Sequence, residues 1–327
     1  MNINQIFELS KVLDTNHFQK IFKRACNKGG YLLDEEDEYL NTSLAGKGIT
    51  VIYRDSQYKK KVRLLIDTDL VIDDMTDTDK LLHKLDKRIG KYFGFKYQMN
   101  DFTLSGMNLV TDIGVGNRAN VSNYLKVLQR VGKIKGLSPV SFDCFDDNAS
   151  FCLSGNSNGI DFLLYDLEKA TIDQLRSADT GRKKLESVSE RTKGVLRAEV
   201  RLTKPKAIRT YTEAADVSGQ IVELVKNRTD VFMDTFTWVV PYGDFHKKDR
   251  AIEIIHQQVT DSTMRRRMIQ LVTLIPEKKS LYLAHKAMNC RNIEKVMKVF
   301  AKINLSPITI SKRHNITHLD NLYSYLR

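Results

Sequence analysis

The stretch Val195-Leu-Arg-Ala-Glu-Val-Arg-Leu-Thr203 alternates apolar and charged residues with a period of two. Successive side chains of an extended strand point to opposite faces of its sheet. The apolar face would hold Leu196, Ala198, Val200 and Leu202, and the charged face would hold Arg197, Glu199 and Arg201. The pattern therefore predicts a strand with one face in a core and one charged face.

Other segments upstream predict the partners of this strand. Ile49–Tyr53 and Val62–Ile66 flank turn residues, as in a hairpin. We also predict strands at 104–113, 140–145 and 160–167, and an exposed helix or insertion at 176–193. With the two helices described next, this order predicts an α+β domain in which helices pack on one face of an antiparallel sheet.

Two helices are marked by their capping residues. Asp77 or Thr78 can cap a helix that ends before Gly94, and Asn120 can cap a second helix that is closed by Gly132. Apolar residues recur at helical spacing along both segments.

The C-terminal part differs in composition, because no glycine follows Gly243. Apolar residues recur there at helical spacing in Ala251–Val259, Met264–Leu274, Leu281–Met288 and Ile293–Ile303. We predict an α+β domain over 1–243 and an all-α C-terminal subdomain over 244–327.

Composition narrows the class of protein. The chain has 327 residues, 42% of them apolar and 28% charged, which excludes collagenous and disordered chains. No apolar run approaches the ~20 residues that span a bilayer, and the first residues lack the pattern of an export signal. The four cysteines form no C-x-x-C pair. We expect a cytoplasmic protein with no membrane partner.

The net charge of +12 favours a polyanion as partner, and nucleic acid is the leading candidate. The basic runs Lys59-Lys-Lys61, with Arg63 nearby, and Arg182-Lys183-Lys184 are candidate contacts to the DNA backbone. A third run, Arg265-Arg-Arg267, lies in the C-terminal part. Each run alone is equally typical of a solvated surface.

The sequence contains no histidine or nucleotide-binding motif that indicates a function. The seven histidines contain no His-x-His pair, and the 314/318 pair lies in a polar segment, so zinc-type chemistry is not predicted. No phosphate-binding glycine loop or dinucleotide fingerprint occurs.

A group of polar residues on three predicted strands is more informative about function. Asn108 and Asp112 share a face of the first strand, and Tyr165 lies on the second with Asp161. If these strands neighbour Val195–Thr203, carboxylates, a tyrosine and two guanidiniums converge on one face. Carboxylates hold a hard metal, arginines bind phosphate, and tyrosine is a nucleophile, which together suit phosphoryl transfer. The alternative is that the alternating charge is only a solvated face.

Three segments resemble a known family in order and spacing. The segment Gly194-Val-Leu-Arg-Ala-Glu-Val-Arg-Leu-Thr-Lys204 resembles the R-x-E-x-R/Q strand of rolling-circle replication initiators of the filamentous-phage gene II/X type and related plasmid proteins. Ile160-Asp-Phe-Leu-Leu-Tyr-Asp-Leu-Glu-Lys169 is similar to the strand of that family that ends in the DNA-attacking tyrosine. Leu104-Ser-Gly-Met-Asn-Leu-Val-Thr-Asp-Ile113 is similar to its S-R-I-D strand, so the resemblance covers roughly 100–204.

The resemblance implies a replication-initiator nuclease fold and a site-specific enzyme that nicks and joins single-stranded DNA. Tyr165 would form a 5′-phosphotyrosine link and free a 3′-OH for the host polymerase. Arg197 and Arg201 would bind the phosphate. Glu199, Asp112 and Asn108 would be the ligands of Mg²⁺ or Mn²⁺.

The sequence departs from the family pattern at Gly106 and Asn108, which stand where the family has Arg and Asp. Leu167 stands where a lysine is expected. Two alternatives therefore stay open: a relaxase-like initiator of a mobile element, and a non-catalytic origin-binding protein or repressor. DNA would be the partner in each case, and a host helicase or polymerase is a further candidate partner of an initiator.

Overall fold

The computed structural model describes residues 2–27, 31–33, 38–41, 48–56, 59–73, 77–94, 96–142, 149–177, 182–290 and 292–326. Within these ranges, the side chains of 31–33, 38–41, 177 and 182–185 are not described.

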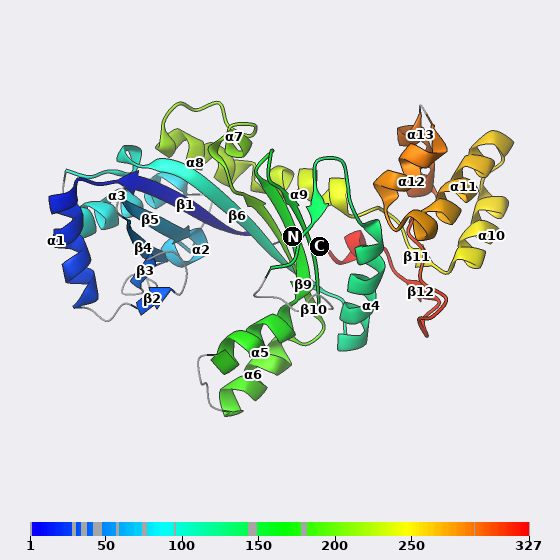
Figure 1. The fold of residues 1–327 in the computed structure, drawn as a ribbon, viewed down its shortest axis with the longest axis horizontal. Helices are drawn as coiled ribbons and strands as arrows, with labels where there is room; N and C mark the ends of the chain where they lie inside the picture. The colour runs from blue at the N-terminus through cyan, green and yellow to red at the C-terminus, as the bar shows by residue number, and fades with distance from the viewer. Residues whose placement is uncertain are drawn as a thin grey trace.

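An antiparallel sheet of ten strands forms the centre of the described structure (Figure 1). Its strand order is β2-β3-β4-β5-β1-β6-β10-β9-β8-β7. The strands are β1 (Asn4–Val12), β2 (Tyr31–Leu33), β3 (Glu38–Asn41), β4 (Ile49–Asp55), β5 (Lys60–Asp67), β6 (Thr103–Gly114), β7 (Ser138–Pro139), β8 (Ser150–Gly155), β9 (Ile160–Asp166) and β10 (Val195–Leu202). The α+β class with a large antiparallel sheet is thus confirmed.

The described strands fall into two halves with the same connectivity. Starting from the centre, the first half runs β1-β5-β4-β3-β2 and the second runs β6-β10-β9-β8-β7. In each half the central strand comes first in the chain and its neighbour comes last. The central strand is followed by a helix in both halves, α1 (Thr15–Cys26) after β1 and α4 (Arg118–Leu128) after β6. The two halves therefore meet at the antiparallel β1–β6 pair.

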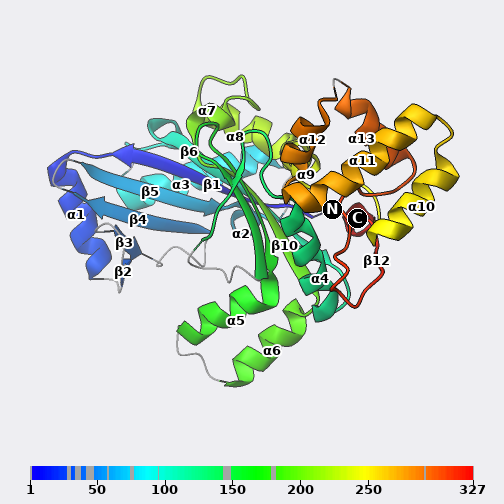
Figure 2. The ribbon, with the colours of Figure 1, turned by 45° about the vertical axis from the view of Figure 1, so that its right-hand side comes forward.

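The halves differ in how their last two strands are joined. Only residues 56–59 separate β4 from β5, whereas α5 (Leu167–Ser177) and α6 (Arg182–Thr192) lie between β9 and β10. Figure 2 shows these two helices beyond the ends of β9 and β10. The exposed helical insertion predicted at 176–193 corresponds to the end of α5 and to α6.

In the chain, each half of the sheet is followed by helices. The first half leads to α2 (Thr68–Val71), α3 (Thr78–Phe93) and a short helix at Met99–Asp101, and the second leads to α7 (Pro205–Ile208), α8 (Val217–Lys226) and α9 (Arg228–Val239). As predicted, Asp77 caps α3, accepting a hydrogen bond from the Lys80 N–H, and Gly94 ends it.

Two predictions need correction. Asn117, not Asn120, caps α4, because the Asn120 side chain donates to the Val115 carbonyl and its own N–H donates to Asn117. The strand predicted over 140–145 is also wrong for its described part. The chain pairs instead at Ser138–Pro139 and again at Ser150–Gly155, and residues 143–148 lie outside the described ranges.

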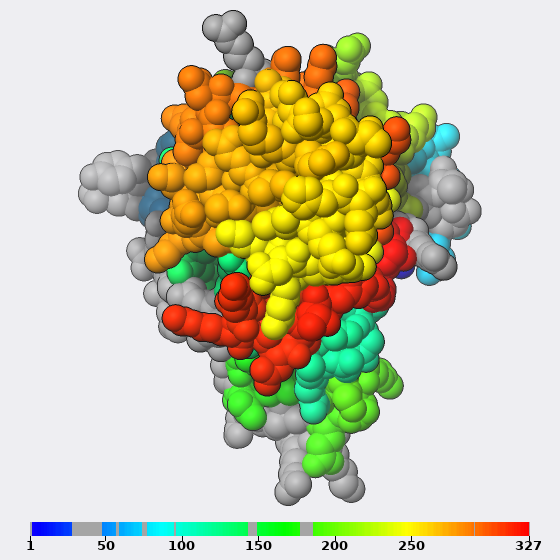
Figure 3. Space-filling view, turned by 90° about the vertical axis from the view of Figure 1, so that its right-hand side faces the viewer, coloured from blue at the N-terminus to red at the C-terminus, as the bar shows by residue number. Residues whose placement is uncertain are grey.

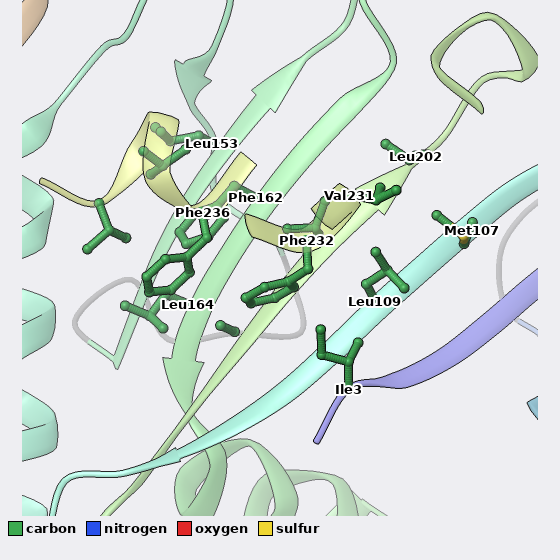
Figure 4. Close-up of a cluster of buried hydrophobic side chains, with 14 of the residues drawn as sticks. Ile3, Met107, Leu109, Leu153, Phe162, Leu164, Leu202, Val231, Phe232 and Phe236 are labelled. Atoms are coloured by element: carbon green, nitrogen blue, oxygen red, sulfur yellow. The ribbon is translucent and has the colours of Figure 1, made fainter. Parts of the chain in front are cut away.

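The core lies between one face of the sheet and the helices. Phe232 and Phe236 of α9 pack against apolar side chains of β6, β9 and β10 (Figure 4). The Phe162 and Phe236 rings meet edge to face, with centroids 6.0 Å apart. The four apolar residues on the inward face of β10, which are Leu196, Ala198, Val200 and Leu202, are fully buried in this core.

The C-terminal part contains α10 (Lys248–Gln258), α11 (Ser262–Lys278), α12 (Leu281–Met288) and α13 (Ile293–Lys302). It also contains a two-stranded sheet, β11 (Phe245–His246) with β12 (His318–Leu319), so the described segment is not purely helical. The predicted boundary at 243/244 falls between α9 and β11. Gly243 has φ +112°, and a Cβ there would lie 2.4 Å from the Leu305 backbone, so glycine permits this close approach.

We expect Phe236→Ala to lower the free energy of unfolding by about 3–5 kcal/mol, because a large cavity would form between α9 and the sheet. Thr237→Ala on the exposed side of the same helix is the control and should change stability by less than about 0.5 kcal/mol. Urea denaturation followed by circular dichroism measures both. Equal effects would show that α9 does not depend on this contact.

Candidate functional site

The register of three strands assembles the predicted residues on the sheet face opposite the α9 core. Arg197 of β10 pairs with Asp112 of β6 on one side and with Tyr165 of β9 on the other. Glu199 pairs with Val110 and Leu163, and Arg201 pairs with Asn108 and Asp161. Period-two alternation on these paired strands places all of these side chains on one face.

The tyrosine hydroxyl is tied to a carboxylate. Tyr165 Oη donates to Glu199 Oε1 at 2.5 Å, and Arg201 donates to Glu199 Oε2 through Nε at 2.9 Å and Nη2 at 2.7 Å. Both carboxylate oxygens are therefore occupied, one by a neutral donor and one by a guanidinium. Glu199 is 7% exposed, and these bonds compensate the cost of burying its charge.

A second ion pair lies beside the first. Arg197 donates to both oxygens of Asp112, from Nε at 2.7 Å and from Nη2 at 2.9 Å. This hydrogen bonding raises the pKa of Arg197 further above its ordinary value. The two guanidiniums and two carboxylates of these ion pairs balance in charge, and Asp161, opposite Arg201, adds one further acidic group to the face.

Burial governs the ionisation of Tyr165. It raises the pKa of the hydroxyl well above the ordinary value of a tyrosine, and the adjacent Glu199 carboxylate raises it further. The charges of Arg197 and Arg201 act in the opposite direction. Tyr165 is therefore protonated at neutral pH, and its proton already points at an acceptor.

A small apolar cluster surrounds the tyrosine ring. Tyr165 is 6% exposed and packs with Cys152, Leu163 and Leu167, and Phe142 lies against the same cluster. The Arg201 guanidinium carbon lies 5.8 Å from the centroid of the Phe142 ring. The first turn of α5 and the segment before residue 143 thus help to cover the tyrosine.

A cavity of about 340 Å³ opens next to this network. Its lining includes Asp112, Arg197 and Glu199 from the site, Asn4 from β1, and Tyr325 near the chain end. This volume accommodates a small group such as a nucleotide phosphate and sugar. Sequence reasoning missed the contribution of the C-terminal residues, because nothing in the local pattern of 318–326 indicates long-range packing.

The three predicted metal ligands do not converge on one point. Asn108 and Asp112 are four residues apart on the same strand face, which separates them by about 13 Å. Glu199 lies opposite Val110, between them, so it can approach either one but the three do not fit a single ion. Both carboxylate oxygens of Glu199 and both of Asp112 also accept hydrogen bonds from protein groups. The Mg²⁺ or Mn²⁺ cofactor stays a prediction, and no step below uses it.

Two of the predicted DNA-binding residues of the hairpin, Lys61 and Arg63, lie on the same sheet face as Tyr165 but at the far end of the sheet. Lys61 and Arg63 are on the outward side of β5, and Arg63 Nη1 lies 3.8 Å from Glu8 Oε2. Counting strands and residues, Lys61 is roughly 40 Å from Tyr165. Lys60 pairs with Asp55, and Lys59 is exposed at the turn.

The other basic runs are less informative. Arg182, Lys183 and Lys184 begin α6, and their side chains lie outside the described residues. In the third run, Arg265 donates to the carbonyls of Val259 and Thr260.

Two further polar contacts lie on β9 and α5; the sequence placed Asp161 beside Tyr165 but did not predict the role of Glu168. Asp161 accepts a hydrogen bond from Ser154 at 2.6 Å across β8 and β9. The buried Glu168 accepts a bidentate pair from Arg118, which anchors α5 to the start of α4. In the part of the chain that the structure describes, the one set of three close metal-ligand side chains lies elsewhere, at Asp244, His246 and His318.

Comparison with protein-family models and with curated proteins found no match. None of the described helices is long and apolar enough to cross a membrane.

The two ion pairs differ in burial, so we expect their arginines to differ in effect. Arg201→Ala leaves the buried Glu199 short of a partner and should lower the free energy of unfolding by about 1–3 kcal/mol. Arg197→Ala frees Asp112, whose side chain is 46% exposed, and should cost at most about 1 kcal/mol. Urea denaturation of the two variants tests this ranking, and the reverse order would contradict it.

Proposed function

We propose that this protein is a replication initiator of the rolling-circle type, which nicks one DNA strand and joins itself to the 5′ phosphate through Tyr165. The observation that carries the proposal is the hydrogen bond from Tyr165 Oη to Glu199 Oε1, flanked by two arginines. A nucleophile, an acceptor for its proton and a phosphate-binding pair are the parts that such a reaction requires. The resemblance of 100–204 to these initiators supports the same conclusion.

The chemical step follows from this arrangement. The oxygen of Tyr165 attacks the phosphorus atom of a backbone phosphodiester, and its proton passes to Glu199. The bond from phosphorus to the 3′ oxygen breaks, and that oxygen takes a proton from water. The products are a 5′-phosphotyrosyl protein and a free 3′-OH. Since burial raises the pKa of Tyr165, proton transfer to Glu199 is concerted with attack in this proposal rather than complete beforehand.

The arginines supply the charge that the transition state needs. In the described structure, Arg197 and Arg201 are each engaged by a carboxylate. A phosphodiester entering the adjacent cavity presents an equivalent pair of oxygens, so a guanidinium can exchange one bidentate partner for the other. This exchange would leave Glu199 less neutralised and therefore a better proton acceptor.

The DNA would extend along the outward face of the sheet. Lys61 and Arg63 lie on that face, roughly 40 Å from Tyr165, which corresponds to about one turn of duplex DNA. We therefore propose that the β4–β5 hairpin contacts duplex flanking the nicked site.

A second candidate function is a non-catalytic DNA-binding protein on the same fold. The burial of Tyr165 and the pairing of both carboxylates with arginines favour this alternative. The two candidates share salt-dependent DNA binding, and a covalent adduct distinguishes them.

Tyr165→Phe should abolish formation of an SDS-stable adduct with labelled single-stranded oligonucleotides from the origin of the element that encodes the protein. DNA affinity should be unchanged, because the substitution removes one oxygen and keeps the ring. Tyr53→Phe is the matched control, since Tyr53 is a buried tyrosine of the first half whose hydroxyl bonds to Tyr92. Assays with Mn²⁺, with Mg²⁺ and with EDTA test the cofactor prediction.

The outcomes separate the candidates. An adduct formed equally well by Tyr165→Phe would show that another residue is the nucleophile. Absence of an adduct for the wild-type protein under all three metal conditions, with DNA binding intact, would favour the non-catalytic function.

Reversing Lys59 and Lys61 to Glu should weaken DNA affinity and flatten its dependence on salt, because fewer counterions are released on binding. Reversing Lys295 and Lys298, two exposed lysines of α13, changes the net charge equally and is the control. Titrations at several salt concentrations measure the slope. Identical slopes for the two double variants would refute a specific role of the hairpin.

A further inference from the structure

The two-stranded β11–β12 sheet brings together three side chains with metal-binding chemistry. His246 is paired with His318, and Asp244 directly precedes β11. The two imidazole rings have centroids 4.7 Å apart, and one ligand atom from each of the three residues lies within 4.8 Å of the others. The cluster belongs to a separate sheet from Tyr165 and takes no part in the proposed nicking.

We propose that Asp244, His246 and His318 bind a divalent transition-metal ion of the Zn²⁺ type, with solvent as the remaining ligand. Two imidazoles and one carboxylate form a donor set that suits Zn²⁺, Co²⁺ or Ni²⁺ and disfavours Mg²⁺, which prefers oxygen ligands. Ligand atoms on a tetrahedral zinc ion are about 3.3 Å apart. His318 Nε2 and Asp244 Oδ2 already lie 3.5 Å apart, so modest side-chain rotation completes the site.

The surroundings of the cluster match those of metal sites in proteins. Asp244 Oδ1 accepts a hydrogen bond from the Asn321 N–H at 2.8 Å, which orients the carboxylate and leaves Oδ2 toward His318. The other nitrogen of His318, Nδ1, lies 3.7 Å from Asp320 Oδ1. A carboxylate beside the second nitrogen of a ligating histidine is a recurrent feature, because it fixes the ring and its tautomer.

The site would fasten the C-terminal segment to the rest of the molecule. Asp244 and His246 follow α9 closely, whereas His318 belongs to the final segment, drawn in red beneath α10 in Figure 3. That segment is also held by Tyr124, whose hydroxyl donates to the Asp320 carbonyl at 2.8 Å.

The same segment leads to the cavity beside the candidate site. Tyr325 Oη donates to Asp320 Oδ2 at 3.0 Å, and Tyr325 and Leu326 line the cavity next to Arg197. A metal at His318 would therefore fix a wall of that cavity from a distance. We infer a structural ion that orders the last residues rather than a catalytic one.

The test uses the full-length, tag-free protein after treatment with EDTA and dialysis. Co²⁺ titration should give visible ligand-field bands that saturate near one equivalent, and Zn²⁺ but not Mg²⁺ should abolish them. His318→Ala and His246→Ala should each weaken binding by roughly tenfold or more. His256→Ala, which removes an exposed histidine of α10, is the matched control and should bind as the wild-type protein does.

His318 is exposed, so its variant should fold, and circular dichroism checks this. Hydrogen exchange of residues 311–326 should slow when Zn²⁺ is added to the wild-type protein and should not change in His318→Ala. No saturable Co²⁺ spectrum, or one that survives in His318→Ala, would overturn the proposed site. Binding without slower exchange in the C-terminal segment would overturn its ordering role. Neither result depends on whether Tyr165 is a nucleophile.

Discussion

The antiparallel register between β6 and β10 is the constraint on which the candidate site depends. It pairs Arg197 with Asp112 and places Glu199 opposite Val110. A slip of one residue would turn every charged side chain of β10 toward the helices and expose its apolar residues. Burial of Leu196, Ala198, Val200 and Leu202 against α9 makes such a slip very unfavourable. The same apolar contacts that stabilise the fold therefore hold the polar network in place.

Local sequence patterns were sufficient to predict several helices and strands, including β10, whose register defines the site. The β4–β5 hairpin, α3 with its Asp77 cap and the β10 strand all follow from periodicity and capping within a short window. Strand β8 was missed because nearly all of Ser150–Gly155 is buried, so its two faces do not alternate in polarity. Asn120 misled the prediction of α4, since the choice between two asparagines depends on the Val115 carbonyl, which only the folded loop brings near.

The site was harder to predict than the strands, because its contacts join residues that are far apart in the sequence. Alternation alone groups Asp112, Tyr165 and Glu199 on one face, but it does not show that arginines hold both carboxylates. It also does not show that Glu199 lies opposite Val110, between Asn108 and Asp112. The histidine cluster is beyond such reasoning altogether. His246 and His318 come from two-residue strands at opposite ends of the C-terminal part, and no spacing in the sequence connects them.

The two halves of the sheet differ in the segment that joins their last two strands, and the candidate site described above lies in the second half. Both halves share one strand order, yet only four residues separate β4 from β5, whereas α5 and α6 intervene between β9 and β10. This insertion supplies Leu167, which covers the ring of Tyr165, and Glu168, whose pairing with Arg118 fixes the insertion to α4. The insertion that distinguishes the second half thus contributes to the burial of its tyrosine, together with Cys152 and Leu163. In the proposed reaction a phosphodiester would have to reach Tyr165 past Leu167 and Phe142, so we expect the Arg118–Glu168 pair to influence the site through the position of α5.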